Sequence, residues 1–353
     1  MKNNEIQGSK NMTIENIVGK TYESIDENTP VSEVISLLKN KEGLIVSKDG
    51  NYSGVLNKRE LSRANINPNA KVKNFLQHVA KVSHLESIEN TAGLMLESDS
   101  YVLPVFEKHK LIGTVSAIDL LLEAVKDDFG EESINNYVTR PLINIASSEP
   151  MSKAIRIFNE EDISRLPVKD KEKIMGMITI NQTLSTYIQP QHRQGGSGQY
   201  DDSSKFGAAM ADKKEILDLP VKGFMVESYK KMEPDESVKN IVNALSENEY
   251  NGILIGKNDS IEGIITKRDL LEPLATSLIK EPMVIQFSGK LDRIADFDKK
   301  WAKDVIFSKL EKYLDFLDNA YVYIRLKRHI EQSKGKHIIY CNMRISSPRG
   351  LFV

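Results

Sequence analysis

Cysteine and long apolar runs are both scarce in this sequence. Among its 353 residues there is a single cysteine, Cys341, which excludes an internal disulfide framework and suits a reducing compartment. No apolar run approaches the roughly 20 residues that a helix needs to cross a bilayer. The polar segment 1–12 lacks the apolar stretch of a signal peptide. We therefore expect a cytoplasmic protein without a membrane partner.

Motifs for catalysis are missing as well. The six histidines show no metal-ligand spacing on one element, and only one cysteine could join them. The sequence has no Gly-x-Ser-x-Gly elbow, and Gly195-Gly196-Ser197-Gly198 lacks the Lys-Ser/Thr of a phosphate-binding loop. We therefore expect that the protein is not an enzyme, binds no metal and requires no cofactor.

Charge is distributed unevenly along a chain whose formal net charge is only −2. Residues 282–353 hold 14 Lys and Arg against 8 Asp and Glu, whereas residues 1–281 hold 34 against 42. A basic end on an acidic body fits an anionic partner for that end, and it fits a solvated surface equally well. The length exceeds the usual size of one hydrophobic core, so two or three domains are expected.

One phrase, Gly-apolar-apolar-Ser/Thr-x-x-Asp, recurs through most of the chain. Intact copies begin at Gly113 and Gly263. Eroded copies, in which another residue replaces the Ser/Thr or the Asp, begin at Gly54 and Gly176. Around each copy the same pattern repeats: an amphipathic helix, a short apolar strand, a polar turn, a second strand, and a new helix at the Ser/Thr. A hydroxyl at this strand-to-helix junction suits an N-cap, because its oxygen accepts an unpaired backbone N–H.

These four units resemble CBS domains (cystathionine-β-synthase domains) over roughly residues 13–278. The Leu103-Pro104-Val105 and Leu166-Pro167-Val168 strands are also typical of that family. The resemblance implies an α/β (α+β) fold in which units 1 and 2, and units 3 and 4, pair as two Bateman modules with symmetric clefts. The expected boundaries are 13–68 for unit 1, 69–130 for unit 2, 131–188 for unit 3, 189–212 for a flexible Gln/Gly/Ser linker, 213–280 for unit 4 and 281–353 for a C-terminal domain.

The resemblance also implies an adenosine-type ligand, whose ribose and phosphate the Ser/Thr and Asp of the signature hold. Two pairs match and are the expected nucleotide-binding residues: Ser116 with Asp119, and Thr266 with Asp269. In the eroded copy of unit 1, Asn57 replaces the Ser/Thr and Glu60 replaces the Asp. In that of unit 3, Gln182 replaces the Asp and supplies no carboxylate. Each module therefore keeps at most one cleft suited to AMP, ADP or ATP. The alternative is that the two hydroxyl residues only cap helices.

The C-terminal domain follows a different pattern. Residues 283–287 form an apolar run, residues 294–317 carry apolar side chains at helical spacing, and residues 320–327 alternate between apolar and polar. A basic turn leads to a second strand at 337–345, and 350–353 can begin a third. The expected order is β-α-β-β-β.

This order, together with the phrase Lys309-Leu310-Glu311-Lys312-Tyr313-Leu314-Asp315, resembles the ribosome hibernation-promoting factor family. The resemblance implies a domain that lies on the small ribosomal subunit and contacts rRNA. Members of that family end with a second helix packed on the sheet, which the sequence up to Val353 does not contain. Either the sequence is truncated, or another surface covers that half of the sheet.

Aromatic and basic side chains alternate along one side of the two long predicted strands. Tyrosines can stack on bases, and Lys or Arg can neutralise phosphates, so this face is expected to bind RNA. The alternative is a core face with solubilising charges around it. The expected RNA-binding residues are Tyr321, Tyr323, Arg325, Lys327, Arg328, Lys334, Lys336, Tyr340 and Arg344.

Two functional hypotheses follow. The main one is a ribosome hibernation or translation-silencing factor that occludes functional sites on the ribosome, with the CBS units as scaffold or adenine-nucleotide sensor. The alternative is an adenine-nucleotide-sensing CBS regulator of a partner enzyme or transporter. A homodimer is compatible with either hypothesis.

Overall fold

A computed structural model provides the structure of the chain. It describes residues 12–38, 41–58, 61, 69–161, 163–180, 217–247, 252–258, 260–277, 283–288, 298–317, 320–330, 337–347 and 350–352. The predicted linker at 189–212 lies outside these ranges, as do Glu60, Gln182, Lys334 and Lys336.

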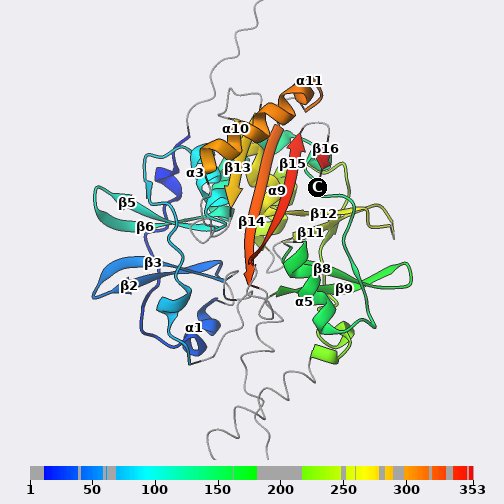
Figure 1. Cartoon of the computed structure of the whole chain (residues 1–353), viewed down its shortest axis with the longest axis horizontal. Helices are drawn as coiled ribbons and strands as arrows, with labels where there is room; N and C mark the ends of the chain where they lie inside the picture. Colours follow the sequence, from blue (N-terminus) through cyan, green and yellow to red (C-terminus); the bar gives the residue numbers. More distant parts are fainter. Residues whose placement is uncertain are drawn as a thin grey trace, which may run out of the picture.

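Each of the four repeat units folds into a three-stranded sheet with a helix inserted after its first strand (Figure 1). The first strand is parallel to the second, and the second is antiparallel to the third. Unit 1 contains β1 (Ser24–Asp26), α1 (Val31–Leu38), β2 (Gly43–Lys48) and β3 (Asn51–Asn57); unit 2 contains β4 (Val82–Ser83), α3 (Ile88–Glu97), β5 (Val102–Glu107), β6 (Lys110–Ser116) and α4 (Ala117–Ala124); unit 3 contains β7 (Ile145–Ala146), α5 (Met151–Glu160), β8 (Arg165–Asp170) and β9 (Lys173–Thr179); unit 4 contains β10 (Lys231–Met232), α8 (Val238–Glu247), β11 (Gly252–Ile255), β12 (Gly263–Thr266) and α9 (Lys267–Ser277).

The middle strand of each sheet is the apolar run that the sequence predicts. Strands β2, β5 and β8 each bury three consecutive side chains, and β11 buries all four of its residues. Consecutive burial is expected where both faces of a strand are covered. The first and third strands flank this core strand, and the helices pack on it.

The units pair as 1 with 2 and 3 with 4. In each pair, the segment that precedes one unit forms a backbone bridge with a strand of the other unit's sheet. Backbone bridges join Gly19 to Thr114 and Val55 to Gln77 in the first pair, and Thr139 to Ile264 and Met177 to Val226 in the second. A Cβ at Gly113 would lie 2.6 Å from the Gly19 oxygen, and one at Gly176 would lie 2.4 Å from the Val226 oxygen. The repeated glycine therefore leaves room for the partner's backbone.

The two pairs meet through units 2 and 4. Helix α3 packs along α9 near the centre of the molecule in Figure 1. Helix α4 contacts both α8 and α9. One hydrophobic core runs through both units and includes Met95 and Leu121 of unit 2 with Leu245 and Leu271 of unit 4. Units 1 and 3 have separate cores. Units 1–4 are called the four-unit body below.

The C-terminal domain is a four-stranded sheet in the order β13-β14-β15-β16, with the predicted β-α-β-β-β succession of elements. Strands β13 and β14 are parallel, and the other neighbours are antiparallel. The predicted helix is interrupted in its described part: α10 ends at Leu310, one 3-10 turn follows, and α11 ends at Leu317, the predicted end. The bounds are β13 (Met283–Ser288), α10 (Lys299–Leu310), α11 (Leu314–Leu317), β14 (Ala320–Ile330), β15 (His337–Ser347) and β16 (Gly350–Phe352).

One face of this sheet packs on α10, and the other lies against the four-unit body. Ala320, Val322 and Ile324 are buried with Ile306 and Leu310 of α10, as the alternating pattern predicts. Tyr323 points the other way, is only 4% exposed, and joins the core shared by units 2 and 4. In Figure 1 the hairpin β14–β15 crosses the centre of the molecule over this core. The four-unit body therefore covers the second face of the sheet.

Candidate functional site

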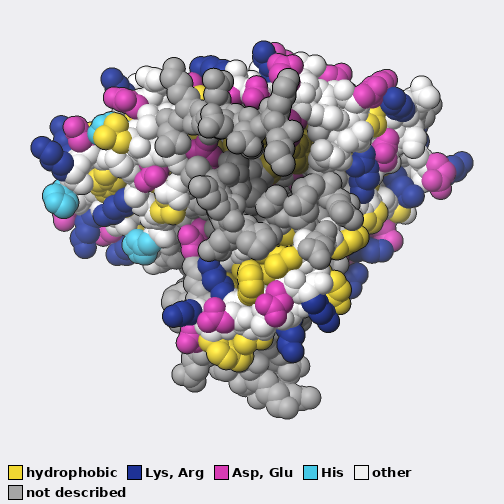
Figure 2. All heavy atoms as spheres, turned by 90° about the horizontal axis from the view of Figure 1, so that it is seen from above, with side chains coloured by type: hydrophobic (Ala, Val, Ile, Leu, Met, Phe, Trp, Pro, Cys, Tyr) yellow, Lys and Arg dark blue, Asp and Glu magenta, His cyan; other side chains and the backbone are white. Residues whose placement is uncertain are grey.

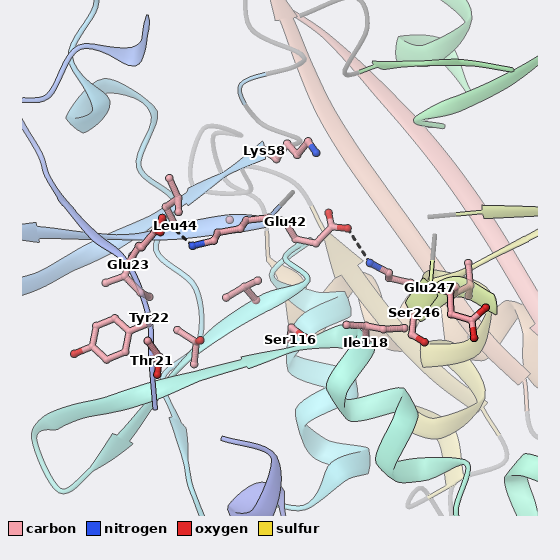
Figure 3. A pocket seen from close by; sticks show the side chains of 17 residues that line it. Thr21, Tyr22, Glu23, Glu42, Leu44, Lys58, Ser116, Ile118, Ser246 and Glu247 are labelled. Atoms are coloured by element: carbon pink, nitrogen blue, oxygen red, sulfur yellow. Dashed lines mark hydrogen bonds and ion pairs between the residues drawn. The ribbon is translucent and has the colours of Figure 1, made fainter. Parts of the chain in front are cut away.

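A cavity of about 420 Å³ opens between units 1 and 2, at the first intact signature (Figure 3). Unit 1 supplies the segment before β1 and the start of β2, and unit 2 supplies the end of β6 and the start of α4. The end of α8 and Lys267 close the cavity from unit 4. Sites for small ligands usually have volumes of about 300–1,000 Å³, so the cavity is large enough for one.

The wall of this cavity combines apolar and hydroxyl side chains. Ile45, Val102 and Ile118 supply apolar surface, and Tyr22 and Thr114 supply hydroxyl groups. In Figure 3 Tyr22 lies across the cavity from the residues that unit 4 contributes. Mixed walls of this kind can hold a flat heterocycle and orient its polar groups.

Ser116 connects the cavity to helix α4. Its Oγ accepts a hydrogen bond from the Asp119 backbone N at 3.3 Å and donates one to Asp119 Oδ2 at 2.5 Å. The predicted pair is therefore brought together, and Ser116 is both a helix cap and a cavity wall. The Asp119 side chain is exposed and lies beside the cavity, outside its lining.

Opposite charges meet inside the cavity. Lys41 Nζ lies 2.8 Å from Glu23 Oε2, and Lys267 Nζ lies 2.8 Å from Glu42 Oε1. Burial opposes ionisation of Glu42, but the charge and hydrogen bond of Lys267, aided by more distant cations, hold the pKa of that carboxyl below its usual range. Lys58 is the third lysine of the lining. The cavity can therefore offer ammonium groups to an anionic ligand.

The eroded signature of unit 1 has a structural role. Asn57 is 5% exposed and donates hydrogen bonds from Nδ2 to Gln77 Oε1 at 3.2 Å and to the Asp99 carbonyl at 2.9 Å. Both acceptors belong to unit 2. The amide that replaces the hydroxyl therefore ties the two units together.

The second intact signature, in unit 4, is buried. Asp269 is 4% exposed, and its Oδ2 accepts the Thr266 backbone N–H at 2.8 Å and the Thr266 hydroxyl at 2.6 Å. The Thr139 hydroxyl donates to Asp269 Oδ1 at 2.7 Å. The predicted pair is again brought together, and Thr139 from unit 3 is added to it.

Arg344 of strand β15 reaches this carboxylate. Its Nη2 lies 2.5 Å from Asp269 Oδ1, 3.2 Å from Thr139 Oγ1 and 3.7 Å from Glu272 Oε2. Burial opposes ionisation of Asp269, but the Arg344 charge and the hydrogen bonds from Thr266, Thr139 and Arg344 keep its pKa below the usual range. The C-terminal domain therefore supplies the cation of a buried ion pair.

Tyr323 and Arg268 form the other half of the same contact. The Arg268 guanidinium lies 3.8 Å from the centroid of the Tyr323 ring, within the range of a cation–π interaction. Arg268 also pairs with Glu272 at 3.2 Å and with Asp99 at 3.7 Å. Tyr323 and Arg344 are cross-strand partners, so both project from one face of the β14–β15 hairpin.

This arrangement corrects the expectation for two of the RNA-binding residues. Tyr323 and Arg344 contact the four-unit body, so the sheet face that carries them is covered, as in the alternative of a core face. The remaining predicted residues within the described ranges have their backbone in β14 and β15, and the structure describes no side chain for them: Tyr321, Arg325, Lys327, Arg328 and Tyr340. Figure 2 shows Lys and Arg interspersed with Asp and Glu on the face it presents.

Sequence reasoning missed Lys267, Glu42 and Thr139 as site residues. One signal was present: the two residues between Thr266 and Asp269 are Lys and Arg, whereas the corresponding residues after Ser116 are Ala and Ile. Basic residues at those positions indicate anionic neighbours. Glu42 and Thr139 carry no local signal, because they reach the site from other units.

Two further classes of site can be tested on the described residues. Within these ranges, no three or more His, Cys, Asp or Glu side chains gather in an arrangement that could hold a metal ion. None of the helices in the part of the chain that the structure describes combines the length and apolar character needed to span a membrane.

A family model described as the CBS domain matches residues 14–67, 134–185 and 221–276. These segments correspond to units 1, 3 and 4, and unit 2 has the same strand order. The chain therefore carries tandem CBS domains. The matched segments end before the C-terminal domain, so they give no support to its resemblance to hibernation factors.

Relatives of this chain include proteins of known and unknown activity. The uncharacterized protein MJ1404 of Methanocaldococcus jannaschii is 23% identical over 353 residues, which cover 97% of this chain and 80% of that protein. A homoserine O-acetyltransferase of Methanohalobium evestigatum is 32% identical over 124 residues, or 31% of this chain. The second match covers only 24% of the acetyltransferase, so it says little about that enzyme's activity here.

Two solved structures share the fold at low identity. MJ1225 of Methanocaldococcus jannaschii, described as a proposed archaeal homologue of g-AMPK, has a TM-score of 0.59 at 18% identity. The likeness covers 75% of this chain and 100% of MJ1225. A conserved protein of Pyrococcus horikoshii has a TM-score of 0.51 at 17% identity, covering 74% of this chain and 100% of that one. Both likenesses concern the fold alone.

Proposed function

We propose that this protein with tandem CBS domains is an adenine-nucleotide-sensing regulator of a partner enzyme or transporter. The observation that carries the proposal is the cavity of about 420 Å³ at Ser116, with lysines from two different units in its wall. The CBS fold supports the same reading, because the family resemblance implies an adenosine-type ligand at this signature. No bond of the ligand is made or broken in this function.

The cavity offers a place for each part of a nucleotide. The apolar side chains of Ile45, Val102 and Ile118 suit the faces of an adenine ring. Ser116, which donates a hydrogen bond to Asp119, is the residue that the family resemblance assigns to the ribose or the phosphate. Lys58 and Lys267 supply charge for phosphate oxygens, since charge-assisted hydrogen bonds are about twice as strong as neutral ones.

Lys267 also couples ligand binding in the cavity to the contact between the two modules. It belongs to unit 4 and pairs with Glu42 of unit 1, so the pair joins the two modules across the cavity. A phosphate that attracts Lys267 competes with Glu42 for the same ammonium group. Ligand binding then changes the contact between the modules, and a partner that binds both modules senses that change.

Calorimetry with AMP, ADP and ATP on the full chain tests this function. Lys267→Ala should weaken binding by roughly ten-fold or more, because a hydrogen bond to a charged group contributes about 1.5–3 kcal/mol. Ser116→Ala should weaken it by a smaller factor, about two- to ten-fold, because a neutral hydrogen bond contributes about 0.5–1.5 kcal/mol.

Thr179→Ala is the matched control, because it removes the same hydroxyl from the eroded signature of unit 3. It should leave nucleotide affinity unchanged. If the wild-type protein shows no heat and no thermal shift with any of the three nucleotides, the CBS units are a scaffold and the proposal is wrong.

A further inference from the structure

The carboxylate of Asp269 has no acceptor capacity left for a ligand. An ionised carboxylate offers about four lone-pair positions, two on each oxygen. Thr266 occupies both positions on Oδ2 through its backbone N–H and its hydroxyl. Thr139 and Arg344 occupy those on Oδ1. Of these four donors, only Arg344 comes from outside the CBS units.

The identity of this fourth donor is what sets the site apart. Thr266 and Thr139 lie within two bridged segments of one module, so they stay in place whenever that module is folded. Arg344 lies 75 residues beyond Asp269, on a separate sheet with its own hydrophobic core. Arg344 can therefore leave Asp269 without unfolding of the CBS module.

We propose that the β14–β15 face is an internal competitor for the ligand site of unit 4, in which Arg344 occupies the Asp269 acceptor that the ribose hydroxyls of a nucleotide would use. A docked C-terminal sheet and a nucleotide at Asp269 then exclude each other. The ligand class rests on the proposed function, whereas the occupant, Arg344, is given by the structure. The protein with its sheet docked binds nucleotide at the Ser116 cavity only.

The contact between the C-terminal sheet and the four-unit body leaves some buried polar atoms without hydrogen bonds among the described residues, which favours opening of this contact. The Tyr323 hydroxyl, Arg268 Nη2 and Arg344 Nε are buried and have no hydrogen-bond partner among the described residues. Buried polar atoms without partners lose their hydration and gain nothing in return. Undocking returns all three atoms to water. The cation–π contact and the Asp269–Arg344 pair hold the sheet down against this loss.

Competition for one carboxylate has a reciprocal consequence. A nucleotide that binds unit 4 only when the sheet is undocked must shift the sheet toward the undocked state by the same factor as docking weakens nucleotide affinity. High nucleotide concentration should therefore release the β14–β15 face. The C-terminal domain becomes the output of the sensor in this scheme.

Arg344→Ala in the full chain tests the competition through two readouts. Hydrogen exchange measures docking of the sheet. Because the variant removes one partner of a buried ion pair, the exchange rate of β15 amides should rise about a hundred-fold or more, relative to β13 as an internal reference. Calorimetry follows the site: the wild type should bind one ADP per chain, and the variant should bind a second. Arg344→Ala combined with Asp269→Asn should lose the second ADP again.

Lys309→Ala is the matched control, because it removes a cation from an exposed position of α10 in the same domain. It should change neither exchange nor stoichiometry. A variant Arg344→Ala that binds ADP once, as the wild type does, would overturn the competition while leaving the proposed function intact. Unchanged exchange of β15 in that variant would also overturn it. Absence of ADP binding in every protein would overturn both proposals together.

Discussion

The two intact signatures of this chain end in opposite situations. Each has a hydroxyl residue at a strand-to-helix junction and an aspartate three residues later. In unit 2 the Asp119 side chain is exposed beside an open cavity, whereas in unit 4 Asp269 is buried under a sheet from another domain. The comparison shows that the motif fixes local geometry, and that the surroundings decide whether a ligand can reach it.

The residues between the hydroxyl and the aspartate account for much of the difference. In unit 2 they are Ala117 and Ile118, which pack in the core and the cavity wall. In unit 4 they are Lys267 and Arg268, which pair with acidic residues of units 1 and 2 and with the Tyr323 ring. These two cations place unit 4 at the junction of the modules and the C-terminal domain.

The largest expected difference between the two sites is in stability. Asp269→Ala leaves the Arg344 guanidinium buried with Glu272 at 3.7 Å as its remaining carboxylate, so it should lower the free energy of unfolding by about 3–5 kcal/mol. Asp119→Ala removes an exposed side chain and should change it by about 0.5 kcal/mol or less. Thermal unfolding followed by circular dichroism measures both. Equal losses would mean that the two aspartates are equivalent.

A methyl group at the signature glycine of unit 4 should have the next largest effect. A Cβ at Gly263 would lie 2.4 Å from Val138 Cγ1 and 2.7 Å from the Thr139 oxygen, so it pushes the segment that carries Thr139 away from Asp269. Overpacking of this kind typically destabilises by about 1–3 kcal/mol. Gly263→Ala should therefore lower the unfolding temperature and raise hydrogen exchange of β15.

The control for this change is Gly223→Ala, since a Cβ there has no atom within 4 Å. It should leave both measurements unchanged. If Gly263→Ala also leaves them unchanged, close approach of the lent segment does not support the docked sheet.

The sequence predicted what is local and missed what is assembled. Alternation in residues 320–327 predicted the buried positions Val322 and Ile324, because a strand side chain repeats its direction every second residue. The same alternation placed Tyr323 on the opposite face and left open whether that face binds RNA or belongs to a core, since one sequence does not reveal which surface will cover a sheet. The glycine repeat likewise predicted the units. No periodic pattern in the sequence indicated the contact between Arg344 and Asp269.

A smaller effect is expected from the hydroxyl of Tyr323. Its oxygen is buried and unpaired among the described residues, whereas its ring stacks on Arg268. Tyr323→Phe keeps the ring and removes the unpaired atom, so stability should stay the same or rise by up to about 1 kcal/mol. Tyr323→Leu, which removes the aromatic face, should instead weaken docking. Equal losses in the two variants would show that the hydroxyl has a partner.

The smallest effect should come from pH between about 5 and 8. The pKa of Asp269 is held below its ordinary value of 3.8. A depressed carboxyl pKa contributes stability that is fully present above the unfolded value and is lost as pH falls through the folded one. Arg344 is the cation paired with this carboxylate, and Glu272 and Arg268 are the further charged groups that act on Arg344. The pKa values of both arginines are raised, so neither loses its charge in this range.

Small-angle scattering from about pH 8 down to pH 3 measures the consequence, because undocking of the sheet increases the radius of gyration. The radius should stay constant down to about pH 4 and rise only below the 3.8 that marks the ordinary aspartate. Asp269→Asn should remove this acid step, since it has no proton to gain. An increase centred between about pH 5 and 7, or an acid step that persists in Asp269→Asn, would show that a different group controls docking.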